Sequence, residues 1–259
     1  MTRSVFTQTL KEQRRALIGW SVALALVPML YLPSYQSLKE QGSLDIEQNA
    51  MYDAMGLSDF ASATGYLNST VYSLLGLILM LIFAVTSAAR TVTQEENGTL
   101  DLLLAQPVGR ISFLAQRFGA LAVQTAVVTA MLTLGVTVGA SQGALDIPTG
   151  NIVAAGAGLG LLTLTVGALT LLIATCTGKR AATLASAALV IVGGYLANNL
   201  GGMSDGTEWL RKLSPFYYAN GSAPLVNGVD AGHFAVLAIL IAAAVAAALA
   251  AFDRRDLAV

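Results

Sequence analysis

The sequence predicts an all-α polytopic membrane protein with six transmembrane helices, on three observations. The 259 residues are 55% hydrophobic and only 11% charged, whereas soluble domains average about 25% charged residues. Six stretches without Asp, Glu, Lys or Arg are each long enough for one crossing of a bilayer, which takes about 20 apolar residues. Positive charge gathers in alternate connecting segments, as is typical of cytoplasmic loops. The composition excludes a disordered chain, a disulfide scaffold and an ordinary soluble enzyme.

The six expected spans belong to a single transmembrane domain, residues 1–259. We place them at 17–37, 67–89, 115–140, 152–176, 182–202 and 234–252. One Arg at the centre of a span would cost about 2.5–3.5 kcal/mol on insertion, so the absence of charge is as informative as the apolar residues. No ionisable residue is expected near the bilayer midplane, which argues against a proton- or sodium-coupled carrier.

The distribution of positive charge predicts that both termini are cytoplasmic. The segments on that side carry most of the Lys and Arg residues: Arg3, Lys11, Arg14, Arg15, Arg90, Arg110, Arg117, Lys179, Arg180, Arg254 and Arg255. Lys39, Arg211 and Lys212 fall on the other side. Residues 5–15 are basic and amphipathic, and we expect them to form an N-terminal helix at the cytoplasmic interface. The alternative is a short frayed tail. The first apolar stretch ends without a small-x-small cleavage site, which indicates an uncleaved span.

The cytoplasmic segment between spans two and three contains a predicted short helix over residues 99–105. Thr99 is a plausible N-cap, Asp101 suits the first turn, and Pro107 ends the helix. One helical face carries Leu100, Leu103 and Leu104. Because so short a helix is not stable alone, we expect it to pack against the membrane surface, its own bundle or another protein. The alternative is an ordinary solvated loop.

The run EENGTLDLLLAQPVGR from Glu95 to Arg110 resembles the signature of ABC transporter permeases of the type-2 (drug and polysaccharide exporter) class. In that family an acidic residue, Gly-Thr-Leu, a leucine-rich turn, Pro and a basic residue stand between the second and third of six spans. A weaker similarity lies at residues 213–218, LSPFYY, before the last span. With six spans and cytoplasmic termini, the resemblance covers essentially the whole chain.

The resemblance implies a half-transporter in the plasma membrane of a bacterium. Two permease subunits, identical or different, would form the translocation path, and two cytosolic ABC ATPase subunits would drive it. Residues 99–105 would be the coupling helix, which contacts the ATPase together with the N-terminal interfacial helix. The residues carried over to that contact are Glu95, Glu96, Gly98, Thr99, Leu100, Asp101, Leu103, Leu104, Pro107 and Arg110.

The sequence itself assigns no catalysis to this chain. It has no Gly-x-x-x-x-Gly-Lys-Ser/Thr phosphate loop, so an ATP-driven pump would need its ATP and magnesium on a separate ATPase chain. We expect no cofactor and no metal on this chain, which has a single histidine, His233. The formal net charge of −1 gives no reason to expect a nucleic-acid partner.

Hydroxyl side chains recur every four residues along span three. They are Thr125, Thr129, Thr133, Thr137 and Ser141. The stripe is either a polar wall of the translocation path or a packing device, in which each hydroxyl bonds a carbonyl four residues earlier or links two helices. The pairs Gly135/Gly139 and Gly156/Gly160 permit close helix packing.

Two other classes of function are open. The Glu95-Glu96 pair partly matches the Glu-Glu-x-x-x-Arg motif of prenyl-type membrane proteases, but Leu100 stands at the Arg position and one histidine is too few. A non-transporting membrane anchor or sensor with the same fold is the other alternative. The sequence does not select a cargo.

Overall fold

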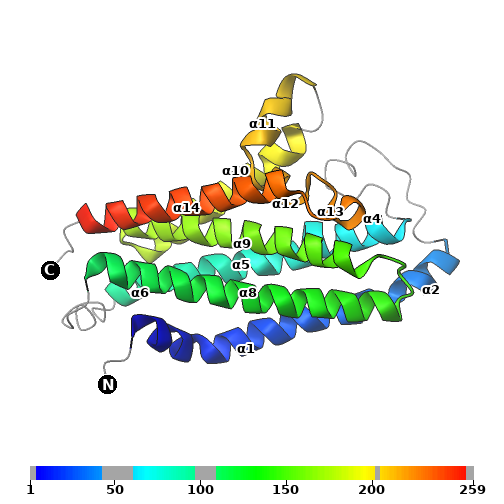
Figure 1. Ribbon diagram of the computed structural model, residues 1–259, viewed down its shortest axis with the longest axis horizontal. Coiled ribbons are helices and arrows are strands. Elements are labelled where there is room, and N and C mark those ends of the chain that lie inside the picture. Colours follow the sequence, from blue (N-terminus) through cyan, green and yellow to red (C-terminus); the bar gives the residue numbers. More distant parts are fainter. Residues whose placement is uncertain (1–3, 43–60, 97–108, 202–204, 255–259) are drawn as a thin grey trace.

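The long helices of the protein run side by side in one bundle (Figure 1). The computed structural model describes residues 4–42, 61–96, 109–201 and 205–254. Within this part of the chain every regular element is a helix, and six stretches are long and apolar enough to cross a membrane. The predicted all-α, six-helix class is therefore confirmed. The long helices are α1 (Val5–Tyr31), α5 (Gly76–Ala88), α8 (Arg110–Gln142), α9 (Thr149–Thr177), α10 (Arg180–Gly201) and α14 (Ala231–Arg254).

Shorter helices lie between the long ones along the chain. They are α2 (Ser34–Glu40), α4 (Ala63–Leu67), the π-helix η1 (Asn68–Leu75), α6 (Arg90–Glu96), η2 (Asp205–Thr207), α11 (Glu208–Leu213), α12 (Pro215–Asn220) and α13 (Pro224–Asn227). Figure 1 shows α6 at the end where α1 begins and α14 ends, which we call the terminus end. Helices α2, α4 and α13 lie at the opposite end, called here the far end.

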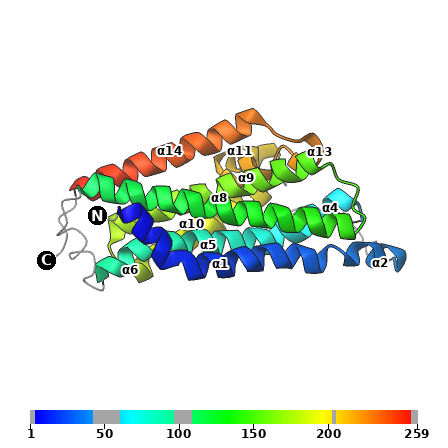
Figure 2. The same cartoon turned by 60° about the horizontal axis from the view of Figure 1, so that its bottom comes forward.

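Residues 5–15 are helical but do not form an element of their own. Ser4 caps α1, because its hydroxyl accepts a hydrogen bond from the Thr7 amide at 3.3 Å. From Val5 the helix continues without a break into the apolar stretch up to Tyr31. Figure 2 shows these first turns inclined to the rest of α1. The amphipathic segment is therefore the beginning of the first long helix.

Helix α9 is the centre of the bundle because small residues let its neighbours approach closely. It is the most buried of the six long helices, and it packs against α5, α8, α10 and α14. A Cβ atom added to Gly160 would lie 2.7 Å from Thr129 Oγ1 on α8, and one on Gly158 would lie 2.7 Å from the Ala219 carbonyl oxygen of α12. These distances leave no room for a side chain, so glycine is required at both positions.

Helices α1 and α8 contact each other backbone to backbone. Three glycines spaced four residues apart face α1 and its C-cap: Gly135 and Gly139 of α8, and Gly143 directly after its end. A Cβ on Gly139 would lie 2.6 Å from the Pro28 carbonyl oxygen, and one on Gly135 would lie 2.8 Å from the Ala25 Cα. The predicted pair Gly135/Gly139 therefore packs on α1, whereas Gly156/Gly160 of α9 packs on the threonines of α8.

The second apolar stretch contains a π-helical segment that the sequence analysis did not predict. Residues Asn68–Leu75 form this segment between α4 and α5. Gly76 directly follows this segment. A Cβ on Gly76 would lie 2.6 Å from the Val71 carbonyl oxygen, so this position has to be glycine. Segments of π-helix inside longer helices are frequent at functional sites.

Candidate functional site

The terminus end is held together by a buried apolar cluster that joins four helices. Phe113 of α8 stacks on Phe252 of α14, with ring centroids 6.3 Å apart. Val5 of α1 and Leu171 of α9 belong to the same buried cluster. The start of α1, the start of α8 and the end of α14 are thereby fixed to one another. The two helices that flank residues 97–108, α6 and α8, both reach this end (Figure 1).

Glu96, the last residue of α6, is bound to the first residue of another long helix. Its Oε1 accepts a hydrogen bond of 2.8 Å from the Arg180 backbone amide, where α10 begins. The first amides of a helix lack partners within it, and the positive end of the helix dipole favours a carboxylate. Gly178, with a φ of +61°, ends α9, and only Gly178 and Lys179 separate α9 from α10. Glu96 thus ties α6 to the turn between α9 and α10.

The structure describes only some of the residues that are predicted to contact an ATPase. Glu96 lies exposed at the terminus end, and Arg110 is the exposed first residue of α8. Glu95 belongs to α6, and its side chain is outside the described part. The coupling helix predicted at 99–105 also lies outside the described residues, as do Gly98, Thr99, Leu100, Asp101, Leu103, Leu104 and Pro107. Their role at an ATPase contact stays a prediction.

The threonine stripe of α8 packs inside the bundle. Thr133 and Thr137 each donate a hydrogen bond of 2.8 Å to the carbonyl four residues earlier, at Thr129 and Thr133 respectively. Thr129 and Thr133 lie against Gly160 and Gly156 of α9, and Thr125 is buried. Packing therefore accounts for the spacing of these hydroxyls. A role in lining a path stays a prediction for Thr125, Thr129, Thr133 and Thr137.

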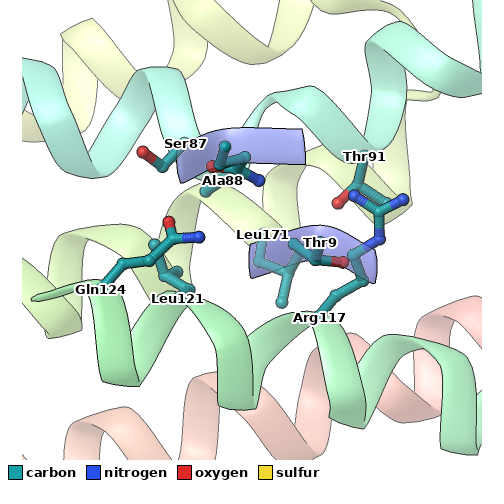
Figure 3. A pocket seen from close by; sticks show the side chains of 9 residues that line it. Thr9, Ser87, Ala88, Thr91, Arg117, Leu121, Gln124 and Leu171 are labelled. Carbon is teal, nitrogen blue, oxygen red and sulfur yellow. The ribbon is translucent and has the colours of Figure 1, made fainter. Parts of the chain in front are cut away.

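A small polar cavity lies among the helices (Figure 3). Its walls come from α1, α5, α6, α8 and α9, and its volume is about 10 Å³. The lining residues are Thr9, Gln13, Ser87, Ala88, Thr91, Arg117, Leu121, Gln124 and Leu171. Five of the polar ones are buried: Thr9, Gln13, Thr91, Arg117 and Gln124. Figure 3 shows the Gln124 amide directed into the space beside Ser87 and Ala88.

Sequence patterns alone do not reveal this polar cluster. The positive charge of Arg117 is typical of a cytoplasmic segment, whereas the structure places Arg117 seven residues inside α8 and only 7% exposed. Its guanidinium lies over the Phe113 ring, 5.2 Å from the centroid. Gln124 is uncharged, so a search for charge-free stretches passes over it. A buried amide within an apolar helix is the signal that would have found the cluster.

The motif at 213–218 joins α12 to α10. Ser214 is 1% exposed, and its hydroxyl donates to the Gly194 carbonyl of α10 at 2.7 Å. The same hydroxyl accepts from the Phe216 amide at 3.2 Å and so caps α12, with Pro215 in its first turn. Phe216 packs edge-on against Tyr195, with centroids 5.8 Å apart. The helix directly before the motif is α11, residues Glu208–Leu213.

His233 is part of an aromatic cluster beside the start of α14. Its ring lies 5.1 Å from that of Tyr217 and 5.4 Å from that of Tyr218, centroid to centroid. Arg211 lies over the Tyr217 ring at 4.9 Å. Asp230 caps α14, and the backbone amides of His233 and Gly232 hold the pKa of its carboxyl below the usual value. The cluster fixes the entry into the last long helix.

A comparison with protein families finds one match over nearly the whole chain. The family model described as the C-terminal domain of the multidrug efflux system permease Rv1217c matches residues 3–253. The chain therefore belongs to this family. A search of the curated proteins found no match. Family membership and the six apolar helices together identify a multi-pass membrane protein of the efflux permease kind.

Proposed function

We propose that this member of a multidrug efflux permease family is the membrane subunit of an ATP-driven exporter of the ABC type-2 class. The observation that carries the proposal is the family match over residues 3–253. The signature at Glu95–Arg110 supports the finer assignment to the type-2 class. In this proposal two copies, or this chain and a similar one, form the path in the membrane.

ATP hydrolysis belongs to a separate cytosolic chain in this proposal. The sequence has no phosphate loop of its own. Residues 97–108 are the segment that the ATPase grips. The flanking helix α6 ends, and the flanking helix α8 begins, at the terminus end of the bundle. With both termini in the cytoplasm, as the charge distribution predicts, this end faces the ATPase.

The hydrogen bond of Glu96 gives the gripped segment a direct connection to α10. In this proposal a displacement of residues 97–108 also displaces the end of α6. The 2.8 Å hydrogen bond between Glu96 Oε1 and the Arg180 amide then transmits the displacement to the start of α10. Glu96 is then a positioning residue, because it acts through α10 and need not touch the ATPase. This role differs from the direct contact that the family resemblance implies.

The test of the proposed function is stimulation of ATP hydrolysis in a purified complex with the cognate ATPase. We expect Leu103→Asp to leave insertion and folding intact and to abolish the stimulation, because a charge replaces the apolar face of the coupling helix. Leu213→Asp is the matched control, since Leu213 is 71% exposed on α11 and lies outside the gripped segment. Normal stimulation by a correctly assembled Leu103→Asp complex would contradict the proposal.

A second measurement separates transport from anchoring. Sealed vesicles that contain the complex should accumulate a fluorescent cationic dye or a labelled lipid only with ATP present. ATP-dependent accumulation of either probe supports the exporter. Stimulated hydrolysis without movement of any probe would favour a non-transporting anchor or sensor with the same fold.

A further inference from the structure

The polar cavity at α1, α5, α6, α8 and α9 has the size of a single water molecule. Its volume of about 10 Å³ is at the lower bound of what one water occupies, roughly 10–15 Å³ on the same measure. A drug-sized ligand needs several hundred Å³. The cavity is therefore a site for one small molecule and is not a part of the path for cargo.

The strongest sign of an occupant is the amide of Gln124. Gln124 is 1% exposed, and its Nε2 has no hydrogen-bond partner among the residues that the structure describes. A buried donor without a partner costs about 1–3 kcal/mol, so such groups are normally satisfied by protein or by water. The amide is directed into the cavity (Figure 3).

The other polar walls present both donors and acceptors. Gln13 supplies a second amide, and Ser87 and Thr91 supply hydroxyls from α5 and α6. None of the nine lining residues is acidic, which disfavours a metal cation. Arg117 brings a positive charge, and the carboxylate of Glu12 on α1 acts on it. The negative charge of Glu12 offsets part of the positive charge at the cavity wall.

We propose that this cavity binds one ordered water molecule that accepts a hydrogen bond from Gln124 Nε2 and bridges it to polar groups of α1, α5 and α6. A water molecule both donates and accepts, which matches the mixed character of the walls. It also exchanges partners easily, so α5 and α6 can shift against α1 and α8 while the Gln124 amide stays satisfied. The site does not depend on the proposed function.

Radiolytic hydroxyl labelling of the purified chain in nanodiscs tests the proposal. Hydroxyl radicals that form from a bound water modify the neighbouring side chains even when these are shielded from bulk solvent. We expect Leu121 and Leu171, which line the cavity, to be labelled several-fold more than buried leucines of matched exposure elsewhere. Leu121 at 5% is compared with Leu81 at 6%, and Leu171 at 2% with Leu162 at 2%.

Two further measurements sharpen the outcome. Gln124→Met removes the donor and fills space, so the labelling of Leu121 and Leu171 should fall to the level of the two control leucines. The comparison within the wild-type chain stands alone if this variant fails to fold. Labelling of Leu121 and Leu171 no higher than that of the controls would overturn the proposal. Suppression of the labelling by chloride but not by sulfate would overturn it too, because the occupant would then be an anion.

Discussion

Gly139→Ala is expected to destabilise the bundle, although the same substitution elsewhere in α8 should stabilise it. The new methyl group would lie 2.6 Å from the Pro28 carbonyl oxygen and 3.1 Å from Leu32 Cδ1. The first distance is about 1 Å shorter than a comfortable contact between non-bonded atoms. The obstacle is the backbone of α1, which cannot rotate away as a side chain would. The two helices must therefore separate along their shared seam.

The magnitude follows from two opposing effects. Overpacking of a tight interior costs about 1–3 kcal/mol, and a backbone obstacle belongs at the upper end. Replacing glycine by alanine inside a helix returns about 1 kcal/mol. The net expectation for Gly139→Ala is a loss of about 2 kcal/mol. Gly119→Ala, whose new methyl would meet only Phe6 at 3.7 Å, should gain up to about 1 kcal/mol.

The assay is reversible unfolding in mixed micelles, followed by circular dichroism, of the wild type and both variants. Gly119→Ala is the matched control, because it makes the same chemical change in the same helix. The two variants should differ by about 3 kcal/mol, roughly a hundredfold in the folding equilibrium. Equal free energies of unfolding for the two variants would refute the argument from close approach.

Three further predictions concern single contacts. Glu96→Ala should lower the stimulation of the ATPase, while Glu96→Gln should retain most of it, because the Gln carbonyl still accepts a hydrogen bond from the Arg180 amide. Glu208→Ala on α11 is the control. Equal losses of stimulation in both Glu96 variants would instead indicate a direct charge contact with the ATPase. Ser214→Ala should cost about 1–2 kcal/mol in unfolding experiments, because α12 loses its cap and the Gly194 carbonyl loses its donor, whereas Ser222→Ala at a half-exposed position should be close to neutral. Because the pKa of Asp230 is lowered in the folded state, its contribution to stability is complete above the unfolded pKa of about 4 and is lost as the pH falls through the folded pKa. The unfolding midpoint should therefore fall more steeply in acid for the wild type than for Asp230→Asn. Parallel curves of midpoint against pH for the two proteins would contradict this prediction.

The sequence predicted the six apolar helices because length and the absence of charge suffice to locate them. The glycine pairs were also informative, since Gly135 and Gly139 do pack against another helix. Which helix they meet was not predictable. The identity of the neighbouring helix depends on the three-dimensional arrangement, and a pair of small residues does not specify which helix packs on it.

The polar details of the bundle were beyond the sequence patterns. The charge of Arg117 favoured a place in the cytoplasmic loop. Hydropathy cannot distinguish a charged residue just outside an apolar stretch from one buried within the bundle. The π-helix at Asn68–Leu75 has an ordinary composition, and its Asn68 is bound to Asn220 of α12 at 3.0 Å. Such a contact between residues 152 positions apart leaves no trace in local periodicity.

The glycine seams have a mechanical consequence. Where two backbones touch, no side chain is available to change its rotamer and absorb a displacement, so α1 and α8 are expected to travel as one block. Helix α10 is different, since it is the least buried of the six long helices and is hydrogen-bonded to Glu96 at its first residue and to Ser214 at Gly194. Any conformational change of this permease should therefore begin as a tilt of α10 against the tightly packed helices α1 and α8.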